Sequence, residues 1–388
     1  MKNATDFSID GTTLVRYIGT GKEINIPEGI TKIANNAFYN CESLVKVTIP
    51  SSVIAIGSYA FWGCENLREV TIKEGLTIID ESAFYNCEQL ETIVLPSTLT
   101  SIGADAFSSC EKLRSIKIPE NVRSIGKKAF CLCRGLKSIT IPKNVTMIGE
   151  KAFSCCSLEE IIITEGGKLT ISENVFSYCS NLKSIIIPGS VTKIGDSAFS
   201  SCINLSKLII QDGVKEIGNS AFEGCTSLRN VNIPRSVTQI GTKAFERCIN
   251  LTETCIPENI TKISAGLFKG CANLTKVSLS ENAKEIDDSA FEDCVELKAI
   301  TIPGNITKIG RAAFKGCVCL SEITIQEGVS EIDKFAFENC VSLFKITIPT
   351  SITKIGKAIF NGCTNLEVYS IPQVVIDRVI NRHLRGLK

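Results

Sequence analysis

Hydrophobic positions recur along this chain with a period of 23 residues. Phenylalanine occupies one position of each period, from Phe38 and Phe61 to Phe360, and cysteine stands three places later, from Cys41 to Cys363. A fixed period between about 20 and 50 residues marks a chain that stacks one supersecondary unit many times. The pattern therefore predicts one elongated body of about fifteen units, and function is to be sought in surface columns of equivalent residues.

Three segments are recognisable in each unit. The first is Leu-x-x-Ile-x-Ile, as at Leu113 to Ile118, whose period of two predicts a short strand with one buried face that ends at a proline. The second, as at Val191 to Gly195, is another short β-prone piece. The third runs through Gly or Asp into Ala-Phe-x-x-Cys, where small polar residues favour one helical turn, and Gly or Asn two residues after the Phe favours a left-handed terminus. We expect each coil to be strand, strand, short helix.

The full motif is Phe-x-x-Cys-x-x-Leu-x-x-Ile-x-Ile-Pro-x-x-Val-Thr-x-Ile-Gly-x-x-Ala, and it covers nearly all of the chain. It resembles the BspA-like, treponemal-type leucine-rich repeats. This resemblance implies an α/β repeat solenoid, a right-handed coil with a parallel β-sheet and short helical turns on the other side. Many proteins of this kind look like surface adhesins or binders of host proteins. The family supplies no catalytic or ligand motif that could be transferred to particular residues.

We expect a single solenoid over residues 1–388, with repeats over 24–372 and a cap at each end. Residues 1–23 contain the turn-forming pair Asp10-Gly11, which predicts a hairpin over the first coil. Residues 373–388 carry Ile376, Ile380 and Leu384 at helical spacing, which predicts a capping helix over the last coil. Both edges would then be protected against edge-to-edge association, and we expect a monomer.

Fifteen of the 19 cysteines fall in one column of the repeat. Stacked coils would place these side chains about 4.8 Å apart with parallel Cβ vectors, whereas a disulfide needs Cβ atoms about 3.8 Å apart that turn toward each other. We interpret the column as buried free thiols. The off-column residues Cys131, Cys155, Cys255 and Cys319 form no Cys-x-x-Cys pair, so we expect no metal site.

Composition and charge exclude several classes of function. Forty-two basic and 41 acidic residues leave a net charge of +1, so a general nucleic-acid footprint is not expected. No apolar run is long enough for a membrane span or a signal peptide. The resemblance favours a cell-surface or secreted protein. The missing signal peptide in this chain favours a cytoplasmic one, and both alternatives stay open.

Catalytic chemistry finds no support in the sequence. The one histidine, His383, stands near the C-terminus, so Ser-His, Cys-His and His-metal arrangements each lack a component. No glycine-rich loop of the phosphate-binding kind joins a strand to a helix. We predict a protein that is not an enzyme, with no catalytic residues and no cofactor.

The residue directly after the Phe forms the most distinctive surface column. It is Tyr39, Trp62 and Tyr85 in three successive coils, followed by Ser108 and later by charged residues. Three aromatic rings at one-coil spacing would suit a protein patch or a glycan. Local packing near the N-terminal hairpin explains the same column. We favour packing over binding because scattered surface aromatics are common.

A second candidate surface lies on the outward side of the first strand. Ile162, Ile186 and Ile209 occupy a position where most other coils carry Thr or Ser. They could form an apolar patch that anchors a partner, or they could reflect ordinary β-propensity. Together these patterns predict a non-enzymatic scaffold for a protein or glycan ligand, in adhesion at a cell surface or, alternatively, in protein interactions inside the cell.

Overall fold

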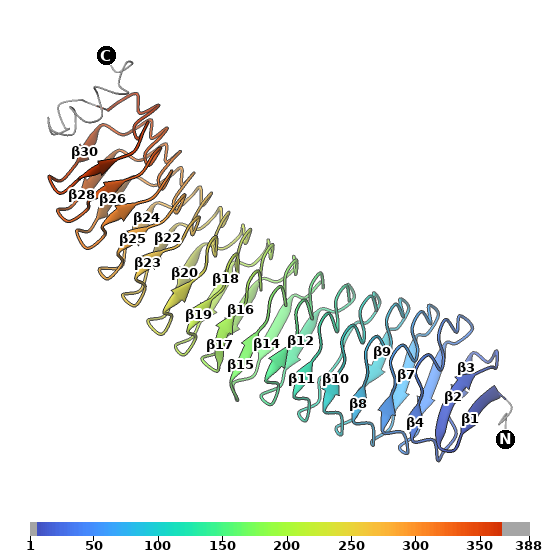
Figure 1. Ribbon diagram of the computed structural model, residues 1–388. Helices are drawn as coiled ribbons and strands as arrows, with labels where there is room; N and C mark the ends of the chain where they lie inside the picture. Colours follow the sequence, from blue (N-terminus) through green and yellow to red (C-terminus); the bar gives the residue numbers. More distant parts are fainter. Residues whose placement is uncertain (1–5, 367–388) are drawn as a thin grey trace. The chain divides into compact units, whose positions relative to one another are not determined.

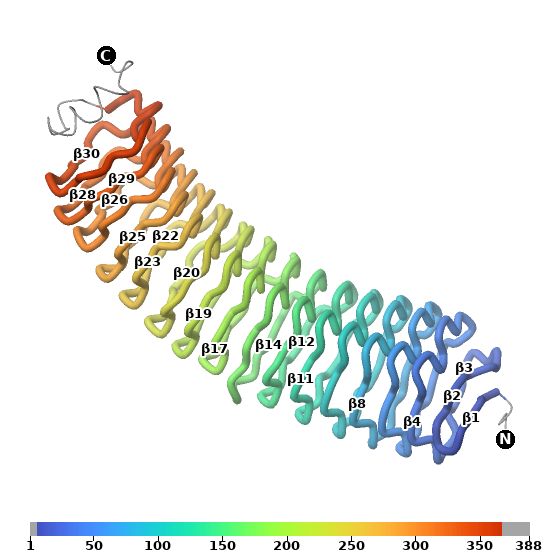
Figure 2. The backbone as a smooth tube through the Cα atoms, in the orientation of Figure 1, coloured from blue at the N-terminus to red at the C-terminus, as the bar shows by residue number. Residues whose placement is uncertain are grey.

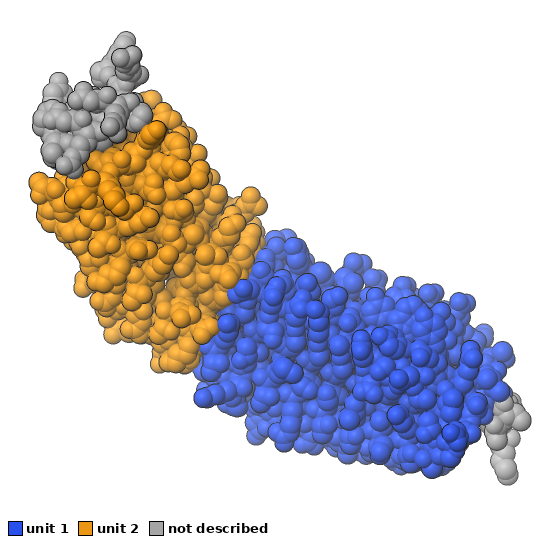
Figure 3. Space-filling model, in the orientation of Figure 1, with its two compact units in different colours: residues 1–203 blue, residues 204–388 orange. Residues whose placement is uncertain are grey.

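The computed structural model describes residues 6–366, so the helix predicted over 373–388 lies outside the described residues. Contacts divide the chain into two compact units, unit 1 over residues 1–203 and unit 2 over residues 204–388 (Figure 3). Each unit is a parallel-strand β-solenoid whose coils repeat every 23 residues or so, with about fifteen turns in the chain (Figure 2).

The first strands of the coils form one face of the solenoid, which we call the first-strand face (Figure 1). The strand predicted over Leu113 to Ile118 is wrong, because that segment makes only an isolated bridge from Ser115 to Thr92. Its pairs are parallel and follow the period, since Val47 pairs with Val70 and Ile300 with Ile323. In unit 1 the face contains β3 (Glu23–Asn25), β5 (Lys46–Ile49), β7 (Glu69–Ile72), β9 (Thr92–Val94), β12 (Ser138–Ile141), β14 (Glu160–Ile163) and β16 (Ser184–Ile187). In unit 2 it contains β18 (Lys207–Ile210), β20 (Asn230–Asn232), β22 (Glu253–Cys255), β24 (Lys276–Ser278), β26 (Ala299–Ile302), β28 (Glu322–Ile325) and β30 (Lys345–Thr347).

The second strand of each coil is only two to four residues long and forms a second parallel sheet, the second-strand face. In unit 1 it contains β4 (Lys32–Ile33), β6 (Ala55–Ile56), β8 (Ile78–Ile79), β10 (Ser101–Ile102), β11 (Ser124–Ile125), β13 (Met147–Ile148), β15 (Leu169–Ile171) and β17 (Val191–Ile194). In unit 2 it contains β19 (Glu216–Ile217), β21 (Gln239–Ile240), β23 (Lys262–Ile263), β25 (Glu285–Ile286), β27 (Lys308–Ile309), β29 (Glu331–Ile332) and β31 (Lys354–Ile355).

The N-terminal end of unit 1 carries the hairpin that the Asp10-Gly11 pair predicts. Strands β1 (Phe7–Asp10) and β2 (Thr13–Tyr17) pair antiparallel, and β2 then pairs parallel with β4. The ring of Tyr17 stacks on Phe38 at 5.3 Å, so the hairpin covers the first phenylalanine of the column.

The prediction of short helical turns is wrong, because residues 6–366 contain no helix. The segment around each Phe is a run of turns, in which alternate backbone N–H groups point to different coils. Phe38 N donates to Ala60 O in the next coil at 2.7 Å, while Cys41 N donates back to Phe38 O at 3.1 Å. A helix would direct all of these donors along its own axis. Here half of them hold the neighbouring coil instead.

This alternation requires a left-handed backbone at two positions in each coil, two residues before and two residues after the Phe. The second position was predicted, and Asn40 and Gly63 have φ of 54° and 67°. The first position was not predicted. It has φ of 60° at Asn36 but also takes bulky residues, such as Tyr59 at 60° and Phe335 at 64°.

The Phe and Cys columns run through the core of each unit beside buried columns of Leu, Ile, Val and Ala. Adjacent Phe rings stack at 4.6 Å between Phe38 and Phe61 and at 5.2 Å between Phe291 and Phe314. The thiol of each following coil donates to the carbonyl of the preceding Phe, as from Cys110 Sγ to Phe84 O at 3.2 Å. All nineteen cysteines are free and fourteen of the fifteen column cysteines are buried, which confirms the interpretation of the column as free thiols.

Replacing one column cysteine tests the role of its thiol. We expect Cys110→Ala to lower stability by about 1–3 kcal/mol, because it leaves the Phe84 carbonyl without its second donor and a small void beside it. The Cys110→Arg variant should lose the cooperative thermal transition, because a buried unpaired charge would separate neighbouring coils. Circular dichroism melting measures both. Equal melting of the two variants would place this column at the surface.

Alkaline pH should destabilise the folded chain. Burial raises the pKa of the Cys87, Cys110 and Cys179 thiols well above their usual range, whereas in the unfolded chain thiols ionise near pH 8.5. The stabilisation is complete below the unfolded pKa and is lost as pH rises toward the folded pKa, because only the unfolded chain releases protons in that window. We expect the melting temperature to fall between about pH 8 and about pH 10. A constant melting temperature over this range would contradict the burial of these thiols.

Candidate functional site

The structure brings the three predicted aromatic residues of unit 1 into one stack. Tyr39 and Trp62 lie 4.7 Å apart between ring centroids with planes 5° apart, and Trp62 and Tyr85 lie 5.8 Å apart at 4°. Tyr39 is 46% exposed, and the other two are half-buried. The turns around successive Phe residues hold them in register, because the N–H of Asn40 donates to the Trp62 carbonyl.

This stacking limits what the aromatic column can bind. Each ring face that lies between two of the three residues is covered by the neighbouring ring, so the ring edges and the outer faces of Tyr39 and Tyr85 are what the stack leaves for a ligand. A sugar binds against the face of an aromatic ring, and neighbouring rings cover most of the ring faces in this stack. Mutual packing is therefore the stronger of the two predicted roles for Trp62.

The predicted isoleucines are exposed on the first-strand face. Ile162 and Ile186 lie on β14 and β16 of unit 1, which pair through Glu160 and Ser184, and they are 47% and 52% exposed. Ile209 holds the equivalent position on β18 of unit 2 and is 38% exposed. Within unit 1 the structure thus places two of the three side chains on neighbouring strands.

In unit 2 the column that follows the Phe is a series of ion pairs. Lys269 Nζ lies 2.7 Å from Glu292 Oε2, and Lys315 Nζ lies 2.7 Å from Glu338 Oε2. The hydrogen bond with Glu338 raises the pKa of Lys315, and the same bond lowers the pKa of Glu338. Burial acts to raise the pKa of Glu292, but hydrogen bonds from Lys269 and Ser289 outweigh it and lower that pKa. These groups are charged at neutral pH, but the face is less solvated than the sequence predicts, because the side chains of Glu292 and Glu338 are only 15% and 13% exposed.

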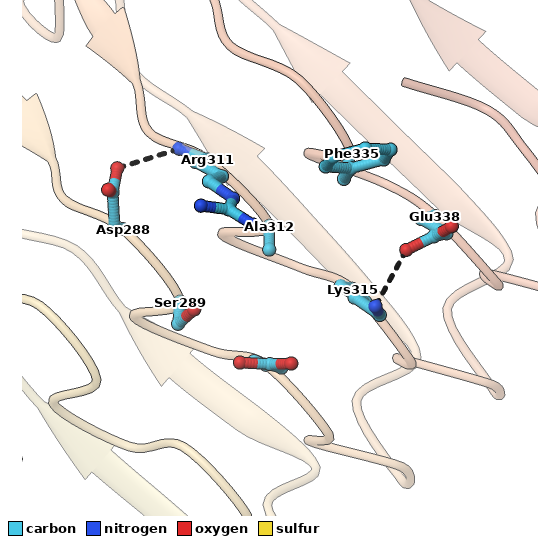
Figure 4. A pocket seen from close by; sticks show the side chains of 8 residues that line it. Asp288, Ser289, Arg311, Ala312, Lys315, Phe335 and Glu338 are labelled. Atoms are coloured by element: carbon cyan, nitrogen blue, oxygen red, sulfur yellow. Dashed lines mark hydrogen bonds and ion pairs between the residues drawn. The ribbon is translucent and has the colours of Figure 1, made fainter. Parts of the chain in front are cut away.

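Beside these ion pairs lies a hollow of about 480 Å³ that the sequence did not predict (Figure 4). We call this cavity the unit 2 hollow. It is lined by residues of three coils, which are Asp288, Ser289, Glu292, Arg311, Ala312, Lys315, Phe335 and Glu338. One feature of the sequence could have indicated the hollow. Phe335 is a large aromatic residue at a repeat position that Ser289, Ala312 and Ala358 fill with small side chains.

Between residues 6 and 366, no group of three or more His, Cys, Asp or Glu side chains is placed to hold a metal ion. In the same range, no helix has the length and apolar character needed to cross a membrane.

Removing the central ring of the aromatic column should cost more stability than removing an end ring. Trp62 stacks on two rings and Tyr39 on one, and an aromatic pair adds about 0.5–1.5 kcal/mol beyond its buried area. We expect Trp62→Ala to lower the melting temperature more than Tyr39→Ala, and Trp62→Phe to retain most of it. Thermal melting of the three variants checks this order. A neutral Trp62→Ala would show that the rings do not pack on each other in solution.

The comparison with known proteins agrees with this architecture. A sequence profile of the BspA-type leucine-rich repeat region, describing six copies, matches residues 17–133, 100–227, 192–318 and 284–380. No curated protein matches the chain. A leucine-rich repeat protein from Bacteroides ovatus is 29% identical with a TM-score of 0.75, over 95% of this chain and 91% of its own. A leucine-rich cell surface protein from Faecalibacterium prausnitzii is 29% identical with a TM-score of 0.50, over 92% of each chain.

The pneumococcal vaccine antigen PcpA is similar in fold alone. It is 22% identical with a TM-score of 0.55, over 92% of this chain and 98% of its own. The profile matches overlap along the repeats and span residues 17–380 without a gap. They coincide with the coils in which the Phe, Cys and strand columns stack. The chain belongs to the BspA-type leucine-rich repeat family.

Proposed function

We propose that this protein is a non-enzymatic scaffold that binds a protein partner in adhesion at a cell surface. Its family is one of repeat scaffolds that typically bind proteins. The relative from Faecalibacterium prausnitzii is named a cell surface protein and aligns over 92% of this chain, which supports the location.

The observation that carries the proposal is the exposed pair Ile162 and Ile186 on the first-strand face of unit 1. The two isoleucine side chains lie about half in solvent on adjacent parallel strands. They expose apolar surface that a partner can bury. Neighbouring coils carry polar side chains at the same position, such as Thr140, which pairs with Ile162. A small apolar centre with a polar rim is the composition of a protein interface.

A second candidate function is an intracellular scaffold for protein interactions. Nineteen free cysteines favour it, because thiols persist in reducing compartments and tend to oxidise outside the cell. Fractionation of the source cells, followed by surface labelling of the intact protein, separates the two candidates. Labelling of the protein on intact cells supports the surface location, and its recovery only after lysis supports the alternative.

Placing lysines at Ile162 and Ile186 should weaken binding strongly without unfolding the chain. We expect Ile162→Lys/Ile186→Lys to weaken attachment of the labelled full-length protein to cultured epithelial cells by at least about tenfold, the effect of about 1.4 kcal/mol. Both positions are exposed, so the melting temperature should change by only a few degrees. Flow cytometry measures attachment, before and after trypsin removes protein from the cell surface.

The control is Val94→Lys, which places one lysine at the same repeat position, 69% exposed, on β9 of unit 1, and is compared with each single variant and with the double variant. It should leave attachment unchanged. Equal attachment of the double variant and the wild type would remove the isoleucine pair from the interface. Attachment that trypsin treatment does not reduce would argue against a protein partner.

A further inference from the structure

The unit 2 hollow lies where a turn position carries the small side chain of Ala312. Ala312 forms its floor, in a column where other coils carry longer residues such as Lys243 or Lys128. Phe335 stands one coil further on, Ser289 stands one coil before, and Arg311 and Lys315 lie on either side of the floor (Figure 4). A cavity of about 480 Å³ falls in the usual size range of ligand sites, about 300–1,000 Å³.

Phe335 carries the aromatic ring in the lining of the hollow. Its backbone has φ of 64°, the left-handed conformation that every coil adopts at this position and that favours Asn or Gly, and Tyr59 shares it at 60°. Ala312 and Ala358 precede and follow it in its column, so no ring covers its faces as Trp62 covers Tyr39. The ring is half-buried and lines the hollow, so it supplies the largest apolar surface there for a ligand.

The polar groups around the ring are positioned by contacts within the unit. The backbone N–H of Arg311 donates to Asp288 Oδ1 at 2.8 Å, which fixes one coil against the next. The Arg311 guanidinium lies over the Phe335 ring with its Cζ 5.9 Å from the centroid, near the outer limit of a cation–π contact of about 6 Å. The guanidinium can therefore turn its donors toward a ligand at small cost.

The hollow has little net charge. The acidic groups are Asp288, Glu292 and Glu338, and the basic groups are Arg311 and Lys315, together with Lys269, which pairs with Glu292 from outside the lining. Three negative and three positive charges balance. Such a rim attracts neither a phosphate, which needs an excess of cations, nor a divalent metal, which needs an excess of carboxylates.

We propose that the unit 2 hollow binds a neutral saccharide unit, a ligand class distinct from the protein partner of unit 1. A sugar ring has an apolar C–H face and a rim of hydroxyl groups that both donate and accept hydrogen bonds. The C–H face lies against the Phe335 ring, whose π-face carries negative charge. The hydroxyls accept from Arg311 and donate to Asp288 and Ser289 above the floor at Ala312.

The variant Phe335→Asn tests the proposal, because Asn suits the left-handed backbone while removing the ring. The full-length chain is tested on an oligosaccharide array. Its binding of methyl β-galactoside and methyl β-glucoside is measured by saturation-transfer NMR. We expect the wild type to bind at least one neutral glycan. The variant should bind it at least about tenfold more weakly, with a melting temperature equal to or above that of the wild type.

Phe344→Ala is the matched control, because Phe344 is a 45% exposed phenylalanine of unit 2 outside the hollow. It should leave glycan binding unchanged, and Arg311→Gln should weaken it. The proposal is overturned if the wild type binds no neutral glycan on the array, or if Phe335→Asn binds as well as the wild type. Equal losses in Phe335→Asn and Phe344→Ala would also overturn it. None of these outcomes tests cell attachment through Ile162 and Ile186, so the two proposals can fail separately.

Discussion

The structure depends on hydrogen bonds from the turns of one coil to the turns of the next. At each Phe the backbone N–H leaves its own coil, as from Phe61 to Ala83 O at 2.7 Å and from Phe84 to Ala106 O at 2.8 Å. Because a buried N–H without an acceptor is costly, a coil is stable only when a neighbour stands in register with it. The stacking of Phe rings at one-coil spacing and the Cys-to-Phe hydrogen bonds follow from that register.

The same register decides what the surface can present. Side chains at equivalent positions lie one strand spacing apart, so a run of similar residues becomes a continuous column. A run of rings covers its own faces, as in Tyr39, Trp62 and Tyr85, and becomes largely a packing element. A single ring among alanines, as at Phe335, lies against the guanidinium of Arg311 and lines a hollow. Alternating charges become ion pairs, as between Lys315 and Glu338.

These columns give a repeat scaffold two ways to acquire binding sites without altering its core. Outward residues of a strand can change from Thr to Ile, as at Ile162, while the alternate residues that face inward stay buried. A turn residue can shrink to Ala, as at Ala312, and open space between its neighbours. Both changes spare the Phe and Cys columns, so the two proposed sites sit on coils that the same contacts hold together.

The sequence by itself determined the repeat, its strands and its core. A 23-residue period and alternating apolar residues, as from Leu297 to Ile302, can be satisfied only by stacked coils, and the buried free thiols followed from the same spacing. Tertiary structure decided the turns. Small polar residues before Ala-Phe favour a helix locally, but hydrogen bonds to the next coil replaced it, and these depend on residues far apart in sequence. The candidate sites divide in the same way. The exposed Ile162 and Ile186 were recognisable from their strand position, whereas the hollow beside Phe335 exists only because three coils meet around Ala312.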